Sequence, residues 1–203
     1  LFLKKINKKI LEHHEIIRNN LEIEDYKNMV KNEAVKLNTQ MEKFVNDPNL
    51  NIDIFNNKNS EYVTADQTVV YYYVKITQIF SDYYITKDIN EFNSFDIFSE
   101  DFKMVGRIRI SADFINQEHE NPYIKKLFNK HGYMLELINL NSFSKGYGES
   151  FVNKLKKLSK ITKLPIWLYD TNSKGKNYFR KMGFKHKGNL GENNEPLMFY
   201  KPK

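Results

Sequence analysis

Hydrophobic residues recur at helical spacing in the first part of the chain. Two stripes follow this spacing: Leu3, Ile6 and Ile10, and then Tyr26, Val30, Ala34, Leu37 and Met41. Side chains three or four residues apart share one face of an α-helix. The pattern predicts two helices within residues 1–46, followed by an Asn-rich loop over 47–61.

Two later segments have the composition of β-strands. Residues 68–80, TVVYYYVKITQIF, are dense in β-branched and aromatic residues, which strands favour. In residues 104–111, MVGRIRIS, one alternating set is Val105, Arg107 and Arg109. The other set is Gly106, Ile108 and Ile110. This alternation predicts a strand with one face exposed.

The order of elements is clearest from residue 133 onward. It predicts a strand at 133–140, a glycine-containing loop and a helix through 151–158. A buried strand at 164–169 follows, and then a helix that begins at Thr171 or Asn172 and ends at Gly183. FKHKG and PLMFYK are the two closing strands. Alternating strands and helices indicate an α/β fold.

Composition and charge narrow the classes of protein. The chain of 203 residues has no cysteine, so disulfides and thiolate chemistry are excluded. Without a signal-like segment or an apolar run of membrane-spanning length, we expect a cytoplasmic protein with no membrane partner. Residues 132–203 carry 14 Lys and Arg against 5 Asp and Glu. This excess indicates either an anionic partner or lysines that only solvate helix faces.

The loop after the strand at 133–140 reads SKGYGESF. Lys145 to Gly148 match the start of an RNA-stacking strand signature, but Glu149 and Ser150 stand where that signature has aromatic and aliphatic residues. The nucleotide P-loop and dinucleotide-binding patterns are absent. Strand, glycine loop and helix form an arrangement in which free N–H groups can hold an anion, although an ordinary tight turn has the same letters.

From Tyr133 onward the chain resembles the GNAT superfamily of acyl-CoA-dependent N-acyltransferases. The family's loop pattern is similar to residues 143–148, FSKGYG, and its later pattern is similar to residues 172–184, NSKGKNYFRKMGF. The resemblance implies an α/β fold with a GNAT-like mixed central sheet flanked by helices. It implies a GNAT-like domain over 61–203, preceded by a helical N-terminal region over 1–60 that is an extension or the rearranged first helices of the fold.

The resemblance also implies that acetyl-CoA is the acyl donor. The backbone amides of the loop would hold the coenzyme pyrophosphate, through Ser144, Lys145, Gly146, Tyr147, Gly148 and Glu149. The edge of the strand that ends at Leu140 would pair with the pantetheine arm. Asn172 would lie near the pantetheine or thiol end.

Two residues are candidates for the proton transfers. Members of the superfamily often carry a strand glutamate that acts as a base through water, and Glu136 has that position here. The family's frequent general acid is a tyrosine, but that position is Phe179 in this chain. Its neighbour Tyr178 is the substitute donor if the helix is rotated. We expect no metal site, because the segment HEIIR lacks the second histidine of a zinc motif.

The resemblance implies transfer of an acetyl group from a coenzyme A thioester to an amine, on a small molecule or a protein. Two alternatives stay open. One is a GNAT-fold binding or regulatory module with weak or no activity, which the missing tyrosine favours. The other is a nucleic-acid-associated protein that uses the basic C-terminal third. A homodimer is compatible with either.

Overall fold

The computed structural model describes residues 12, 15–16, 19, 22–45, 74–87, 93–113, 121–171 and 177–203. The elements in chain order are α2 (Ile23–Val45), β1 (Tyr84–Lys87), β2 (Ser94–Phe98), β3 (Met104–Asp113), α4 (Pro122–His131), β4 (Met134–Ser142), α5 (Tyr147–Thr162), β5 (Ile166–Tyr169), α6 (Tyr178–Lys181), β6 (Lys185–Asn189) and β7 (Pro196–Tyr200). In the described part of the chain, no helix is long and apolar enough to cross a membrane.

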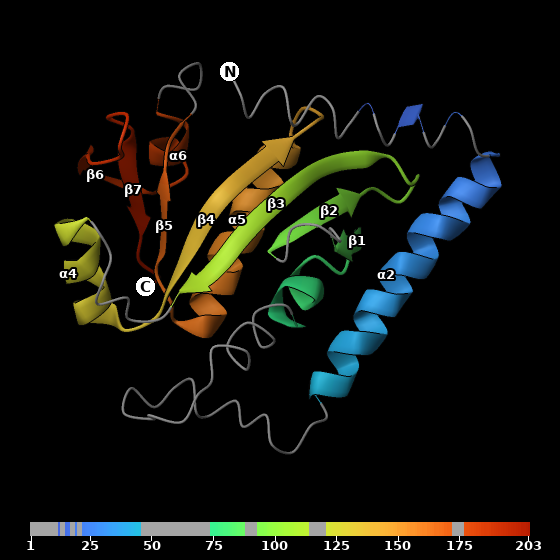
Figure 1. Cartoon of the computed structure of the whole chain (residues 1–203), viewed down its shortest axis with the longest axis horizontal. Helices are drawn as coiled ribbons and strands as arrows, with labels where there is room; N and C mark the ends of the chain where they lie inside the picture. Colours follow the sequence, from blue (N-terminus) through green and yellow to red (C-terminus); the bar gives the residue numbers. More distant parts are fainter. Residues whose placement is uncertain are drawn as a thin grey trace.

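The strands form one mixed sheet with helices on both faces (Figure 1). The strand order is β1-β2-β3-β4-β5-β7-β6, and only the β4–β5 pair is parallel. A parallel pair requires a crossover, and α5 supplies it. The predicted α/β fold with a mixed central sheet flanked by helices is therefore confirmed.

Alternate residues of β5 show that α4 and α5 cover opposite faces of the sheet. Ile166 and Leu168 belong to one buried cluster with the apolar face of α5, which consists of Phe151, Val152, Leu155 and Leu158. Trp167 belongs to a second cluster with Ile124 and Phe128 of α4. Both faces of β5 are thus buried, as the uninterrupted apolar run in its sequence predicts.

Helix α2 lies at the β1 edge of the sheet (Figure 1). All five residues of its predicted stripe, from Tyr26 to Met41, are buried. Tyr26 and Val30 pack with Phe98 and Met104, and Leu37 and Met41 contribute to the main core. The first predicted stripe lies outside the described residues.

Two sequence expectations about strands are wrong. Residues 74–79 form a helix, and the rest of the predicted strand at 68–80 lies outside the described residues, except for the turn at Phe80. Strand β3 is not half exposed, because Arg107 is only 6% exposed and makes two hydrogen bonds to Asp96 of β2, at 2.5 and 2.8 Å. Burial of a charged residue here is made possible by its partner on the neighbouring strand.

The buried pair gives a test of the sheet. Removal of one partner from a buried ion pair leaves an uncompensated charge, which costs about 3–5 kcal/mol. We expect Asp96→Ala to lower the free energy of unfolding in urea by that amount. The control is Asp82→Ala, which breaks an ion pair with Lys154 whose carboxylate is 59% exposed and should cost about 1 kcal/mol or less. Equal losses in the two variants would contradict this prediction.

Candidate functional site

Strands β4 and β5 diverge soon after they begin. Their parallel pairing consists of Leu135 with Ile166 and Glu136 with Trp167. Beyond these two pairs a cavity of about 110 Å³ lies between the strands, lined by Leu137, Ile138, Asn139, Leu140, Leu168, Tyr169, Asp170, Thr171, Tyr178 and Phe179. The edge of β4 at residues 138–140 therefore faces a cleft and not a neighbouring strand.

A β-bulge in β4 accompanies the divergence. Strand β3 pairs Arg109 with Asn139 and the next residue, Ile110, with Leu137, so Ile138 has no partner in the register. A bulge of this kind bends its strand and increases the local twist. Ile138 is 42% exposed, as expected of an extra residue at a bend.

The loop after β4 ends at the uncapped N-terminus of α5. Gly146 occupies the N-cap position with φ +91°, and no side chain caps the helix. A Cβ at Gly146 would have no atom within 4 Å, so the space beside the loop is open. Ser142 Oγ donates to Ser144 O at 2.7 Å, which braces the loop. Free N–H groups and the positive end of the helix dipole are thus available to an anion.

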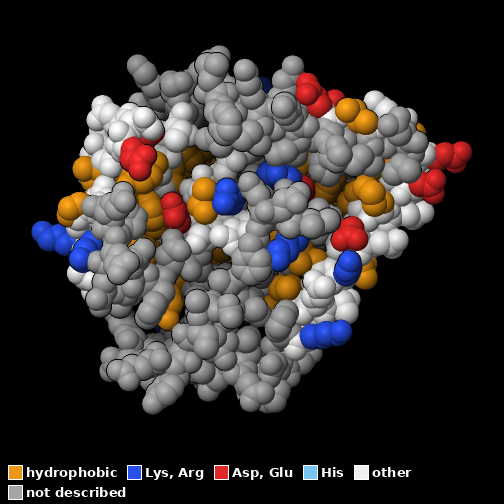
Figure 2. Space-filling model, viewed as in Figure 1, with side chains coloured by type: hydrophobic (Ala, Val, Ile, Leu, Met, Phe, Trp, Pro, Cys, Tyr) orange, Lys and Arg blue, Asp and Glu red, His pale blue; other side chains and the backbone are white. Residues whose placement is uncertain are grey.

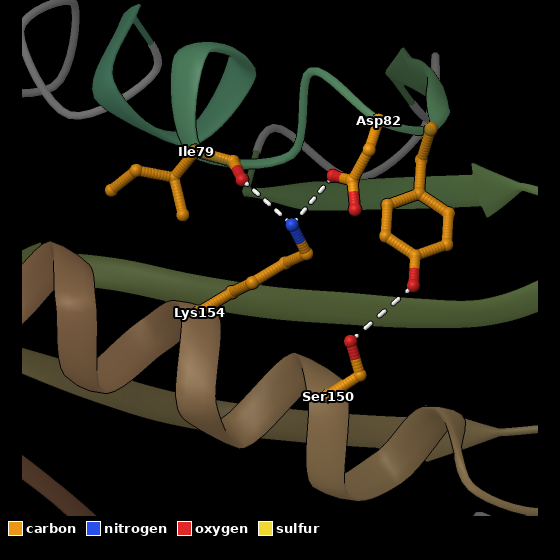
Figure 3. Close-up of polar contacts among 5 residues, drawn as sticks. Ile79, Asp82, Ser150 and Lys154 are labelled. Atoms are coloured by element: carbon orange, nitrogen blue, oxygen red, sulfur yellow. Dashed lines mark hydrogen bonds and ion pairs between the residues drawn. The ribbon is translucent and has the colours of Figure 1, made fainter.

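Lys154 connects α5 by polar contacts to the turn that precedes β1 (Figure 3). Its Nζ donates to the carbonyl oxygen of Ile79 at 3.0 Å and pairs with Asp82 Oδ1 at 2.5 Å. One turn earlier in α5, Ser150 Oγ lies 3.3 Å from the hydroxyl of Tyr83. These contacts fix the first half of α5, which carries the open N-terminus.

Tyr178 points its hydroxyl at the same helix end. The hydroxyl oxygen is buried and has no hydrogen-bond partner among the described residues. It lies 3.3 Å from the position that a Cβ on Gly148 would occupy. Burial, with a smaller contribution from the charge of Glu149, raises the pKa of Tyr178 above 10.0. A neutral phenol with an unused proton therefore lies between the cleft and the glycine loop.

A larger cavity of about 670 Å³ opens beside the cleft on the face that α4 covers. Its lining includes Glu136, Glu192 and Glu195 together with the aromatic rings of Trp167 and Tyr169. Figure 2 shows acidic and hydrophobic side chains next to one another at the left of this face, where β5, β7 and α4 lie in Figure 1. The cavity shares residues 137 and 138 with the cleft, so the two spaces adjoin.

The carboxylates give this second cavity, the acidic pocket, a negative field. Burial raises the pKa of Tyr169 first, and the charges of Glu136, Glu195 and Glu192 raise it further, while its hydrogen bond from Asn121 lowers it. Hydrogen bonds from its own backbone and from Asn193 lower the pKa of Glu195. Glu195 is therefore ionised at neutral pH, and the acidic pocket suits a cation.

Asn121 joins three elements at one wall of the acidic pocket. Its Oδ1 caps α4 by accepting from the N–H groups of Tyr123 and Ile124, at 3.0 and 3.4 Å. Its Nδ2 donates to Tyr169 OH at 3.2 Å and to Leu190 O at 2.9 Å. One side chain thus fixes the start of α4, the end of β5 and the start of the β6–β7 turn.

The structure brings most of the predicted site residues together. Leu140 and Tyr178 line the cleft, Glu136 lines the acidic pocket, and residues 144–149 form the loop and first turn of α5. Asn172 lies outside the described residues. Phe179, 8% exposed, packs in the core, and Phe143 packs beside Phe98 and Met104.

Sequence reasoning missed the residues that shape the acidic pocket. The N-cap Asn121, followed by proline, is a helix-start signal that marks α4. Glu192 and Glu195 belong to a turn between two expected strands. No local sequence signal indicates that this turn lies beside Glu136, because the contact depends on the β5–β7 pairing.

Comparisons with known proteins give matches to solved structures alone. No family model and no curated protein matches the chain. The N-acetyltransferase YlbP of Bacillus subtilis, in complex with coenzyme A, is 22% identical over 77% of this chain and 91% of its own, with a TM-score of 0.39. NAA60 of Arabidopsis thaliana, with a bisubstrate analogue, is 15% identical over 54% and 76%, with a TM-score of 0.39. Arylalkylamine N-acetyltransferase 2 of Aedes aegypti is 12% identical over 90% and 97%, with a TM-score of 0.41.

These similarities concern the fold. The chain's own seven-stranded order, its single parallel pair and the crossover through α5 define a GNAT-like sheet.

The double role of Asn121 can be separated by two substitutions. Asn121→Asp keeps the oxygen that caps α4 but loses the donor to Tyr169 and Leu190, whereas Asn121→Ala loses both. Loss of an N-cap costs about 1 kcal/mol. We expect both variants to speed amide hydrogen exchange at residues 190–195, and the alanine variant alone to speed it in the first turn of α4. Unchanged exchange at residues 190–195 in both variants would contradict the role of the Asn121 amide in holding this turn.

Proposed function

We propose that the chain is an acyl-CoA-dependent N-acyltransferase that transfers an acetyl group from acetyl-CoA to a cationic amine. The observation that carries this proposal is the divergence of β4 from β5 beside the uncapped N-terminus of α5. An open strand edge can pair with an extended amide-containing chain, and an open helix end can hold a pyrophosphate. One ligand with both parts is a coenzyme A thioester.

The fit of the coenzyme rests on two features of the loop. A Cβ at Gly146 would have no atom within 4 Å, so a pyrophosphate could approach the backbone amides of residues 144–149. Lys145 is exposed at the loop and supplies a positive charge. When bound, the coenzyme would supply the activated acyl group as a thioester. The edge of β4 through Leu140 would orient its pantetheine arm, and Asn172 is proposed for the thiol end on the family resemblance alone.

The acidic pocket is the proposed entry for the amine. An amine arrives protonated, and the charges of Glu136, Glu192 and Glu195 favour its binding over that of an anion. Glu136, at the last position where β4 still pairs with β5, would accept the proton, directly or through water. The neutral amine then attacks the thioester carbonyl carbon, and the carbon–sulfur bond breaks.

Tyr178 is the proposed acid for the leaving sulfur. Its buried hydroxyl has no described partner to compete for the proton, and its raised pKa keeps the phenol protonated through neutral pH. The phenol proton would pass to the thiolate as the carbon–sulfur bond breaks, and the second proton lost by the amine nitrogen would restore the phenol. The first amine proton, taken by Glu136, would leave to solvent. Tyr178 would thus do what the family's tyrosine does, with Phe179 in the core.

Acetylation of an amine panel tests the function. The panel contains small primary amines with a second positive charge, neutral and anionic primary amines, and lysine-containing peptides, and release of free thiol from acetyl-CoA is measured. We expect turnover with cationic acceptors and little with anionic ones. If acetyl-CoA binds but no acceptor is acetylated, the chain is a coenzyme-binding module and the enzymatic proposal fails.

Tyr178→Phe tests the proposed proton donor. General acid catalysis contributes about 10²–10⁴-fold, so we expect kcat to fall by at least about a hundredfold while the affinity for acetyl-CoA changes little. Because the pKa of Tyr178 is raised, kcat of the parent chain should not decline through loss of this proton below about pH 10. Tyr200→Phe is the control, since Tyr200 packs beside Phe184 and Lys156. An unchanged kcat in Tyr178→Phe would exclude the role.

A further inference from the structure

Six lysines lie around the β6 edge of the sheet. This group, the lysine edge, consists of Lys130, Lys156, Lys185, Lys187, Lys201 and Lys203. Strand β6 is the last strand of the sheet, and β7 beside it ends at Tyr200. Neither 151–169 nor 177–191 nor 196–203 contains an Asp or Glu, so carboxylates of these segments do not interrupt the positive surface.

Ring contacts place the lysines on both faces of this edge. Lys187 Nζ lies 5.8 Å from the ring centroid of Phe199, and the ring of His131, next to Lys130, lies 5.7 Å from the same ring. On the other face, Lys156 Nζ lies 5.4 Å from the ring centroid of Tyr200. The end of α4, the middle of α5 and the β6–β7 pair therefore meet around the last residues of β7.

Some lysines elsewhere in the described residues have acidic partners, and the lysines of the lysine edge do not. On α2, Lys27 and Lys36 each pair with a glutamate one turn away, and on α5 Lys154 pairs with Asp82. None of the six lysines forms an ion pair with any residue that the structure describes. Unneutralised charges of one sign repel one another, so their positive field is available to an outside anion.

The coenzyme phosphates do not account for this surface. Lys130 comes just before β4 begins, whereas the glycine loop follows the end of β4. The nine residues of β4 separate these points by about 30 Å, at about 3.3 Å per residue. Lysines on an edge strand also discourage pairing between sheets, which explains Lys185 and Lys187 but not Lys130 on α4 or the lysines after β7.

We propose that the lysine edge binds the phosphate backbone of a nucleic acid. A phosphate chain presents regularly spaced single charges, which match ammonium groups that act as point charges. Lysine binds phosphate as a point charge, and the six residues are all lysine. Phe199 is 5% exposed beneath its lysine and is not available for base stacking, and the proposed contact is through the phosphate backbone, without sequence preference.

Fluorescence anisotropy with two labelled probes tests this site: a single-stranded uridine 20-mer RNA and a 20-base-pair DNA duplex. The edge variant carries Lys130→Gln, Lys185→Gln, Lys187→Gln and Lys201→Gln. The control variant carries Lys27→Gln, Lys31→Gln, Lys36→Gln and Lys43→Gln on α2, which removes the same charge. The milder pair Lys185→Gln and Lys201→Gln serves if the fourfold variant unfolds at a lower temperature than the parent.

We expect the parent to bind at about 50 mM salt, and the edge variant to bind at least tenfold more weakly while the control changes by less than about threefold. Each lost phosphate contact makes the negative slope of log K against log salt shallower by about 0.9 for a duplex or 0.7 for a single strand, so four substitutions should reduce its magnitude by about 3. The two probes distinguish a single RNA strand from a DNA duplex as the source of the phosphates.

Several results would overturn the proposal. One is that neither probe binds at about 50 mM salt, and another is that the edge and control variants lose equal affinity. A third is that polyglutamate of equal charge displaces the RNA as readily as unlabelled RNA does. A fourth is that saturating acetyl-CoA displaces the RNA. The last would place the phosphates in the glycine loop.

Discussion

The functional region depends on the loss of pairing between two parallel strands. Strands β4 and β5 stay together for two residue pairs, and β4 then bends away at the bulge formed by Ile138. Because backbone amides next to a neighbouring strand are already paired, a continuous parallel sheet would leave no edge for a ligand. The bend leaves residues 138–140 open and brings that edge to the end of α5 and to the acidic pocket.

The N-terminus of α5 has unpaired amides and the positive end of the helix dipole, so other contacts have to hold the helix in position. Gly106 in β3 provides room for Phe151, since a Cβ there would overlap the ring, and Lys154 with Ser150 ties the helix to the turn before β1. These contacts come from segments that are distant along the chain. A helix end fixed in this way costs little reorganisation when it meets an anion, which is the advantage of a preorganised site.

Local pattern predicted the elements whose side chains follow a single period. The stripe of α2, the apolar face of α5 and the uninterrupted run of β5 all have the burial that their spacing indicates. The local pattern gave wrong predictions in two places. Arg107 is buried because Asp96 lies opposite it on β2, a pairing that the local pattern does not show. Residues 74–79 are helical despite their β-branched composition. The resemblance led us to expect a role for the strand edge that ends at Leu140, whereas the acidic pocket arises from the pairing of β5 with β7, which no local period encodes.

Binding of acetyl-CoA is the most direct measurement of the central claim, that the open edge of β4 and the end of α5 form one coenzyme site. Thermal unfolding and amide hydrogen exchange are measured with acetyl-CoA at about 100 times its dissociation constant, and again with ATP at the same concentration. Linkage predicts about 2.7 kcal/mol of stabilisation, a rise of several degrees in Tm, with slower exchange at residues 138–140 and 144–149. No rise with acetyl-CoA, or an equal rise with ATP, would contradict the claim.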